Sequence, residues 1–384
     1  MCGVIGVISS KESVAADLMN GLTSLVHRGA FSSGILTAKN GRFATVMRKE
    51  GSAARAYKQS DLEGIVGSSA IGHTRYPTSG SAGFSQTQPK YMTFPGIGMA
   101  HNGNLLNHLS LQKTLAHRGY SLATELDSEV LLHVLGEHII GKQERGQGTH
   151  SYVTETLFPA LQELVSGTEL SIQGAASFVA LVPQHGLLAF RDVRGLRPLW
   201  YATKNDGATH AFASETIALK ELQGYTSHQE VPPGEAIFIT NDLQIYKTSI
   251  HQEQESRCFV ERVYLGRAES VYGDRSNEEH RYQLGLILAK EFAHLKNKID
   301  VVVDVPKTPI PVAVALATIW GKKYGGVHAT NGSKRTYMEP TQTLRERAAG
   351  SKFSYNPRMI RGMRVGAVDD TIYRGTNSKS AVTA

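Results

Sequence analysis

The chain opens with Met1-Cys2-Gly3-Val4-Ile5-Gly6, a cysteine placed directly before a short apolar stretch that predicts a β-strand. If Met1 is removed, Cys2 carries a thiol and a free α-amino group on the same residue. An α-amino group titrates near ~7.7–8.0, so it can serve as the general base for its own thiol. The stretch therefore predicts an N-terminal nucleophile on a rigid strand, although a cysteine at position 2 also occurs by chance.

Length and composition indicate the class of protein to which this cysteine belongs. The 384 residues are too many for one ordinary domain and indicate two. With 41% hydrophobic and 20% charged residues, the chain is typical of a soluble globular protein. It contains no long apolar run and no signal-peptide pattern at its start, so we expect a cytoplasmic protein that does not contact a membrane. Cys2 and Cys258 are the two cysteines, and both are expected to be free thiols.

The charge is unevenly distributed along the chain. Residues 1–256 carry 20 Lys and Arg against 22 Asp and Glu, a net charge of −2, whereas residues 257–384 carry 21 against 12, a net charge of +9. The second region is thus expected to attract a polyanion. A solvated basic face, a nucleic acid and a phosphorylated small molecule all fit this charge, and only local motifs separate them.

The texture of the sequence changes near residue 256. Up to residue 250, short apolar stretches bounded by Gly, Pro and Asn predict antiparallel strands, and separate helical patterns predict an α+β layered fold. The expected strands are 3–8, 70–74, 97–100, 177–182, 187–191, 199–202, 211–213 and 236–240, and the expected helices are 13–25, 105–117, 128–140 and 153–164. Afterwards helix 278–295, strand 301–305, helix 311–323 and strand 364–368 alternate, which predicts a parallel, doubly wound sheet.

Four polar segments follow or end apolar stretches in the first region, where functional residues often lie. They are His27-Arg28-Gly29, Gly72-His73-Thr74-Arg75-Tyr76-Pro77-Thr78, His101-Asn102-Gly103-Asn104 and Asp127-Ser128-Glu129. Hydrolysis of glutamine needs an arginine for the α-carboxylate, a carboxylate for the α-ammonium, and an amide with a glycine N–H for the oxyanion. Three of these segments also have a plain structural interpretation: Arg75 in a surface ion pair, Asn102-Gly103 in a hairpin turn, and Asp127 as a helix cap.

Taken together, residues 2–250 resemble the N-terminal-nucleophile glutamine amidotransferase domain, an αββα sandwich of the α+β class. The resemblance implies that Cys2 is the nucleophile and that Asn102 and Gly103 form the oxyanion hole. It further implies that glutamine is bound by Arg28, Arg75, Tyr76, Thr78 and Asp127. The chain departs from the family at Ala30-Phe31, where a polar pair is usual after His-Arg-Gly.

A second motif follows the expected strand 364–368. It reads Asp369-Asp370-Thr371-Ile372-Tyr373-Arg374-Gly375-Thr376-Asn377-Ser378-Lys379. Backbone N–H groups and hydroxyls in such a loop can hold a phosphate, and the two carboxylates can face ribose hydroxyls or Mg²⁺. A surface turn is the plain alternative.

This motif resembles the substrate loop of type I phosphoribosyltransferases, which implies an α/β domain over residues 257–384. With both halves combined, the chain resembles the glutamine phosphoribosylpyrophosphate amidotransferases, which make 5-phosphoribosylamine in the first step of de novo purine synthesis. The resemblance implies Mg²⁺ held by Thr308, Asp369 and Asp370. The implied phosphoribosyl-pyrophosphate ligands are Arg335, Lys352, Asp369, Asp370, Thr371, Arg374, Gly375, Thr376, Asn377 and Ser378.

Some features of the second region differ from this family. Ala329-Thr330-Asn331-Gly332 replaces a basic and aromatic run, and the phosphoribosyltransferase domain is expected to be incomplete beyond Ala384. An iron–sulfur cluster normally takes four thiolates, so none is expected. The resemblance implies a homo-oligomer that acts on small molecules and not on nucleic acid. Two alternatives stay open: a paralogue that aminates another phosphorylated acceptor, and a non-catalytic sensor of phosphoribosyl pyrophosphate or a nucleotide.

Overall fold

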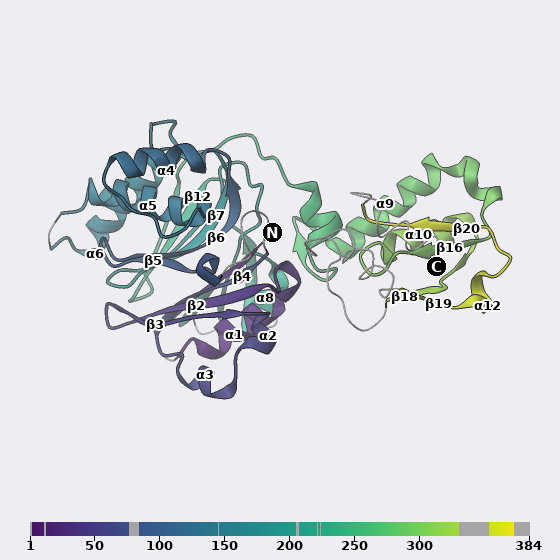
Figure 1. The fold of residues 1–384 in the computed structure, drawn as a ribbon, viewed down its shortest axis with the longest axis horizontal. Helices are drawn as coiled ribbons and strands as arrows, with labels where there is room; N and C mark the ends of the chain where they lie inside the picture. Colours follow the sequence, from purple (N-terminus) through teal and green to yellow (C-terminus); the bar gives the residue numbers. More distant parts are fainter. Residues whose placement is uncertain are drawn as a thin grey trace. The chain divides into compact units, whose positions relative to one another are not determined.

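The computed structural model describes residues 2–10, 13–76, 84–144, 146–204, 207–220, 222, 224–329 and 353–371. The chain divides into two compact units, Met1–Cys258 and Phe259–Ala384, coloured along the sequence in Figure 1.

The first unit contains two antiparallel sheets in its described residues. The first sheet has the strand order β11-β9-β10-β1-β4-β2-β3 and the second has the order β13-β12-β8-β7-β6-β5. The strands of the first sheet are β1 (Gly3–Ser9), β2 (Ser32–Lys39), β3 (Arg42–Glu50), β4 (Ser69–Arg75), β9 (Trp200–Lys204), β10 (Thr209–Ala213) and β11 (Tyr225–Glu230). Those of the second are β5 (Lys90–Met92), β6 (Ile97–Leu105), β7 (Gly174–Val182), β8 (Gly186–Phe190), β12 (Glu235–Thr240) and β13 (Ile245–Ser249).

The two sheets pack face to face through a shared apolar core. Val4 and Ile71 of the first sheet join Val179, Leu187 and Ile237 of the second in one buried cluster. These residues alternate along their strands with residues that face the other way, as the two-residue period of a β-strand requires. Consequently β1, in the middle of the first sheet, is buried on both faces along its whole length.

Helices cover the outer faces of both sheets, which can be followed in Figure 1. The helices α1 (Ala15–Ser24) and α8 (Thr216–Lys220) pack on the first sheet, and α4 (His108–His117), α5 (Asp127–Ile140) and α7 (Phe158–Val165) pack on the second. The remaining elements are η1 (Val26–Arg28), α2 (Ala53–Ala56), α3 (Gln59–Glu63), η2 (Phe84–Gln86), α6 (Thr149–Ser151) and η3 (Tyr152–Leu157). The predicted αββα sandwich is confirmed.

The second unit is built on a parallel sheet with the order β17-β16-β20 in its described residues. These strands are β16 (Val301–Asp304), β17 (Lys323–Tyr324) and β20 (Val365–Val368), and they pack on α9 (Asn277–Glu291) and α10 (Ile310–Trp320). The other elements are η4 (Glu261–Leu265), β14 (Val271–Tyr272), β15 (Arg275–Ser276), η5 (Ala293–Lys298), β18 (Val327–Ala329), β19 (Phe353–Tyr355) and α12 (Pro357–Ile360). The predicted α/β alternation is confirmed.

Both long helices of this unit have recognisable ends. The helix α9 begins with a capping box: the hydroxyl of Ser276 accepts from the Glu279 N–H at 3.1 Å, and the Glu279 carboxylate accepts from the Ser276 N–H at 2.7 Å. The helix α10 ends directly before Gly321, which has a φ of 63°. This left-handed conformation suits glycine and ends the helix three residues before the Lys323 expected from the sequence.

Candidate active site

Cys2 lies directly before β1, between β10 and β4 of the first sheet. Its side chain is half-buried, and its thiol lies 3.9 Å from the carbonyl oxygen of Tyr76. The backbone is closely packed at this point, because a Cβ on Gly3 would come within 2.7 Å of the Thr74 hydroxyl. The sequence therefore places its N-terminal cysteine at a tightly held strand end, as predicted.

Asn102 and Gly103 lie inside β6 and do not form a hairpin turn. They pair with Ser177 and Ala176 of β7. A Cβ on Gly103 would lie 1.9 Å from the carbonyl oxygen of Ala175, so only glycine fits there. The structure excludes the turn interpretation of this pair.

The side chain of Asn102 is fully buried, and within the part of the chain that the structure describes neither its oxygen nor its nitrogen has a hydrogen-bond partner. A buried polar group left in this state costs about 1–3 kcal/mol. Such groups are rare in folded proteins and call for a functional explanation. A side-chain amide that can donate a hydrogen bond to a ligand oxygen is what an oxyanion hole requires.

Arg75 ends β4 and is buried, so it does not belong to a surface ion pair. Its guanidinium donates to the main-chain and side-chain oxygens of Gln86. Burial lowers the pKa of Arg75, and the charges of Cys2 and Asp127 oppose this effect. These interactions indicate that three predicted site residues lie near one another: Arg75 at the end of β4, Cys2 at the start of the chain and Asp127 at the start of α5.

Asp127 is the first residue of α5, and Leu126 occupies the capping position. One oxygen of its carboxylate accepts from the Leu105 N–H at the end of β6, at 3.2 Å. The interpretation of Asp127 as a helix cap is thus not what the structure shows. The carboxylate instead joins the start of α5 to the strand that carries Asn102 and Gly103.

His73 and His101 are buried next to these residues. Burial, aided by the charge of Arg75, lowers the pKa of His73 to about 3. Burial also lowers the pKa of His101, against the charges of Asp127 and Cys2. Both rings are therefore neutral at neutral pH.

Two further residues predicted to bind glutamine lie close to Cys2. Tyr76 follows β4, and its carbonyl oxygen is the group near the Cys2 thiol. Arg28 ends η1, where it is fully buried and bonded to the main chain of Cys2 and to Glu215. The geometry of Arg28 thus differs from that expected of a residue lining an open pocket. Thr78 lies outside the described residues.

The acidic pair of the second unit follows β20, and Thr308 follows the neighbouring parallel strand β16. The carboxyl ends of parallel strands are the usual place for a ligand in such sheets. Burial first, and then the charge of Asp369, raise the pKa of Asp370 to about 6, whereas hydrogen bonds from Thr308 and Thr371 oppose the shift. Thr308, Asp369, Asp370 and Thr371 therefore converge at one sheet edge.

This edge suits a hydrated magnesium ion. Mg²⁺ is usually bound by one or two carboxylates together with substrate phosphates. Among the described residues there is no group of three or more His, Cys, Asp or Glu side chains that could hold a metal alone. Seven of the residues predicted to bind phosphoribosyl pyrophosphate lie outside the described part of the chain: Arg335, Lys352, Arg374, Gly375, Thr376, Asn377 and Ser378.

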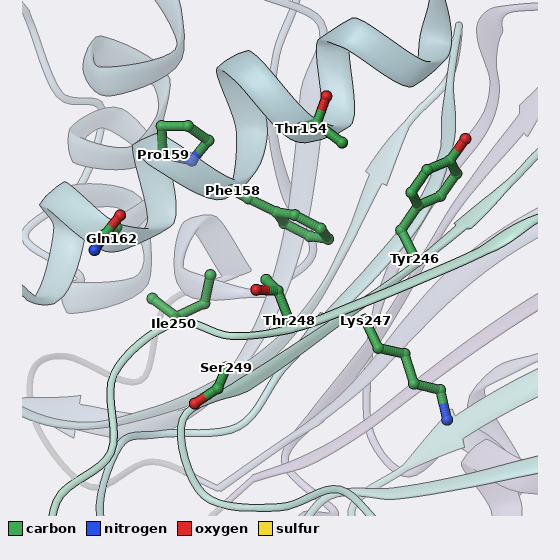
Figure 2. A pocket seen from close by; sticks show the side chains of 9 residues that line it. All are labelled: Thr154, Phe158, Pro159, Gln162, Tyr246, Lys247, Thr248, Ser249 and Ile250. Carbon is green, nitrogen blue, oxygen red and sulfur yellow. The ribbon is translucent and has the colours of Figure 1, made fainter.

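A shallow pocket of about 410 Å³ lies elsewhere on the first unit, between α7 and β13. Figure 2 shows Phe158 directed towards Thr248, whereas Lys247 points away. The pocket is lined by Thr154, Phe158, Pro159, Gln162, Tyr246, Lys247, Thr248, Ser249 and Ile250. It contains neither a cysteine nor a carboxylate, and none of the predicted site residues lines it.

Comparisons with known proteins show which family this chain resembles. A family model for the glutamine amidotransferase domain matches residues 81–154. The amidophosphoribosyltransferase of Escherichia coli K12 is 33% identical over 395 residues, which cover 100% of this chain and 75% of that protein. The amidophosphoribosyltransferase of Saccharomyces cerevisiae is 32% identical over 400 residues, which cover 100% and 76%.

Two solved structures are also similar to this chain over its whole length. The glutamine phosphoribosylpyrophosphate amidotransferase from B. subtilis, complexed with ADP and GMP, has a TM-score of 0.82 at 30% identity. The match covers 100% of this chain and 78% of that one. A structure described as the allosteric regulatory enzyme of purine biosynthesis has a TM-score of 0.83 at 30% identity, covering 100% and 77%.

A sandwich of two antiparallel sheets, with a cysteine directly before the central strand of one sheet and a buried Asn-Gly pair in the other, defines a glutamine amidotransferase of the N-terminal-nucleophile class. With the parallel second unit and relatives matched over its whole length, the chain belongs to the amidophosphoribosyltransferase family. The family predicted from the sequence is confirmed.

Proposed function

We propose that the two units divide one reaction, the synthesis of 5-phosphoribosylamine from glutamine and phosphoribosyl pyrophosphate that opens de novo purine synthesis. The first unit releases ammonia from glutamine, and the second joins that ammonia to the ribose. Membership of the amidophosphoribosyltransferase family supports the overall reaction. The assignment of residues to each step rests on the geometry of the two sites.

Cys2 is the nucleophile of the first step. After removal of Met1, its α-amino group accepts the thiol proton, and the sulfur attacks the side-chain carbonyl carbon of glutamine. The amine then gives the proton to the leaving ammonia, which leaves a glutamyl thioester on Cys2. Water hydrolyses this thioester, and glutamate departs with the free thiol regenerated.

The negative charge that develops on the amide oxygen during this attack is stabilised by the Asn102 side chain and the Gly103 N–H. The single observation that carries the proposal is the buried, unpartnered amide of Asn102, which suits an oxyanion. For the substrate's own charges, Arg75 pairs with the α-carboxylate and Asp127 with the α-ammonium. Arg75 is coupled electrostatically to both Cys2 and Asp127. Tyr76 and Thr78 complete the pocket.

The second step takes place at the carboxyl edge of the parallel sheet. Asp369, Asp370 and Thr308 would hold Mg²⁺, which when bound supplies positive charge to the departing pyrophosphate. Thr371 and the loop residues Arg374–Ser378 would receive the 5′-phosphate, while Arg335 and Lys352 would contact pyrophosphate. The convergence of Thr308 on Asp370 supports this assignment.

From family membership we propose that the enzyme is a homo-oligomer, that it is located in the cytoplasm and that it acts on small molecules. In the part of the chain that the structure describes, we found no helix long and apolar enough to cross a membrane.

The decisive experiment replaces the nucleophile. Cys2→Ala should lose glutamine hydrolysis by at least about 10³-fold, since neither a thiolate nor a thioester remains. The same variant should keep the synthesis of phosphoribosylamine from free ammonia at the level of the parent chain. Cys258→Ala is the matched control and should hydrolyse glutamine normally. Hydrolysis that survives in Cys2→Ala would remove the basis of the proposal.

A further inference from the structure

Arg28 is enclosed by the protein beside the nucleophile. Its side chain is 0% exposed, at the end of η1. Its Nε donates to the main-chain carbonyl oxygen of Cys2 at 2.9 Å, and its Nη1 donates to Glu215 at 2.5 Å. A guanidinium buried in this way is stable only when it is paired and hydrogen-bonded. Its contacts therefore tie the charge to the first residue of the mature chain.

Glu215 is the anion that holds Arg28. It is 4% exposed and lies between β10 and α8. The same carboxylate oxygen that accepts from Arg28 lies 2.8 Å from the Nε2 atom of His27. Burial alone would raise the pKa of Glu215, but the charges of His27 and Arg28 and their hydrogen bonds hold this pKa well below its usual range. The carboxylate is thus ionised and keeps the guanidinium in place.

Ser214, the residue before Glu215, is hydrogen-bonded to Val4, two residues after Cys2. The hydroxyl of Ser214 accepts from the Val4 N–H at 3.0 Å, and the Ser214 N–H donates to the Val4 carbonyl oxygen at 3.0 Å. The Ser214-Glu215 turn thus holds the start of β1 twice, directly at Val4 and through Arg28 at Cys2. The contact at Val4 comes from a residue 210 positions away in the sequence.

A terminal nucleophile needs such support. Once Met1 is removed, no preceding peptide group restrains Cys2. The Cys2–Gly3 peptide plane and the torsion ψ then set the direction of the amine, and the torsion χ1 acts with them to set the direction of the thiol. A hydrogen bond to the Cys2 carbonyl fixes that plane. Misplacement of a reacting group by about 1 Å can cost about 10²-fold in rate.

We propose that Arg28, held by Glu215, is a positioning residue that clamps the Cys2 carbonyl and thereby orients the terminal amine and thiol for attack. This inference rests on the proposed function, because it assumes that Cys2 is the nucleophile. It replaces the direct contact with glutamine that the sequence resemblance implies for Arg28. The guanidinium of Arg28 has no exposed surface and donates to Cys2 and Glu215, so it contacts other protein groups and not the substrate.

The test separates positioning from substrate binding in steady-state glutaminase kinetics of the full chain. Arg28→Lys keeps the charge but loses the planar set of donors that spans Cys2 and Glu215. We expect kcat to fall about 10- to 100-fold while KM for glutamine stays within about threefold, because only an interaction used in the transition state is lost. A rise in KM with unchanged kcat would show that Arg28 binds glutamine and would overturn the inference, as would unchanged kinetics.

Arg281→Lys is the matched control for the loss of a buried arginine. Arg281 lies in the second unit, is also buried, and donates to the main-chain carbonyls of Arg262 and Gly266. This substitution should leave kcat and KM for glutamine within about twofold of the parent values. A matching fall of kcat in the control would mean that the effect of Arg28→Lys is general loss of structure.

Glu215→Gln tests whether the carboxylate acts through Arg28. It keeps the size of the side chain and should lower kcat about 3- to 30-fold with little change of KM. The double variant Arg28→Lys, Glu215→Gln should be no slower than Arg28→Lys alone, within about threefold, since both changes disable one clamp. Effects that multiply fully would contradict the clamp.

Failure of this inference is distinguishable from failure of the proposed function. If Cys2→Ala abolishes glutamine hydrolysis but Arg28→Lys raises only KM, Cys2 is the nucleophile and the clamp is wrong. If Cys2→Ala keeps hydrolysis, the nucleophile itself is wrong, whatever the Arg28 variants do.

Discussion

A single buried side chain, Asn102, connects the fold to the chemistry. Its amide has no partner among the described residues although it is fully enclosed in β6. The strand pairing that buries it also sets Gly103 against β7, so that a main-chain N–H and a side-chain amide come from consecutive residues. Two donors of this kind, fixed in a water-poor site, stabilise negative charge without rearranging.

Asn102→Ala should therefore lower kcat for glutamine hydrolysis by about 10²- to 10³-fold and change KM much less, because the lost donor acts on the transition state. Steady-state kinetics of the purified variant measures both quantities. A large rise of KM at constant kcat would assign Asn102 to substrate binding instead.

The buried side chain of His73 predicts how the stability of the first unit depends on pH. The pKa of His73 is lowered to about 3 in the fold, below the unfolded value of about 6.5. The unfolded state thus binds more protons between these values, so stability is fully present above pH ~6.5 and is lost as the pH falls below it. The loss is about 1.4 kcal/mol for each pH unit.

His73→Gln should flatten this dependence on pH. Urea unfolding at about pH 5 and about pH 7, followed by Trp200 fluorescence in a Trp320→Phe background, reports the first unit alone, since these are the two tryptophans of the chain. Equal loss of stability in the variant and in the parent between these pH values would contradict the assignment to His73.

At the scale of elements, the close approach of β6 and β7 depends on Gly103. A Cβ there would lie 1.9 Å from the Ala175 carbonyl oxygen and 2.4 Å from the His101 Nε2 atom. Gly103→Ala should thus separate the strands, reduce the free energy of unfolding by about 1–3 kcal/mol and abolish glutamine hydrolysis. Gly148→Ala is the control, because a Cβ at Gly148 meets nothing within 4 Å. Urea unfolding and a glutaminase assay check both, and a fully active Gly103→Ala would be contradictory.

Periodicity predicted several elements that have a clear apolar pattern, and it missed two neighbouring strands of the first sheet. The strand β1 and the helices α5 and α10 were expected close to their observed bounds. The strands β2 and β3 were not expected, although Asn40-Gly41 between them is a typical hairpin turn in which both residues have positive φ. Much of β3 is exposed, so its sequence lacks the apolar repeat that marks a strand.

The predicted residues around Cys2 came from motifs, and the structure adds what motifs do not show. Arg75, Asn102 and Asp127 were found because each stands in a polar segment that follows or ends an apolar stretch of the sequence. Glu215 was not among the predicted site residues, and its pairing with Arg28 across 187 residues follows from the fold alone. No local pattern in the sequence predicts such a contact.

At the scale of the whole molecule, the two units predict separable defects. Asp370→Asn should leave basal glutamine hydrolysis within about twofold of the parent, because Asp370 belongs to the second unit. The same variant should bind phosphoribosyl pyrophosphate with Mg²⁺ at least about tenfold more weakly, since one charged oxygen ligand is lost. Isothermal titration calorimetry measures this affinity, and an unchanged value would show that the acidic pair is an ordinary turn.

The central claim is that Cys2, freed of Met1, carries the glutamyl group, and mass spectrometry of the acid-quenched enzyme mixed with glutamine tests it most directly. Trypsin cleaves after Lys11 and after Arg257, so the two cysteines fall on different peptides. The account predicts an N-terminal peptide that begins at Cys2 and carries a glutamyl thioester, with the Cys258 peptide unmodified. An enzyme that hydrolyses glutamine while Met1 is still attached, or that carries the glutamyl group on Cys258, would contradict it.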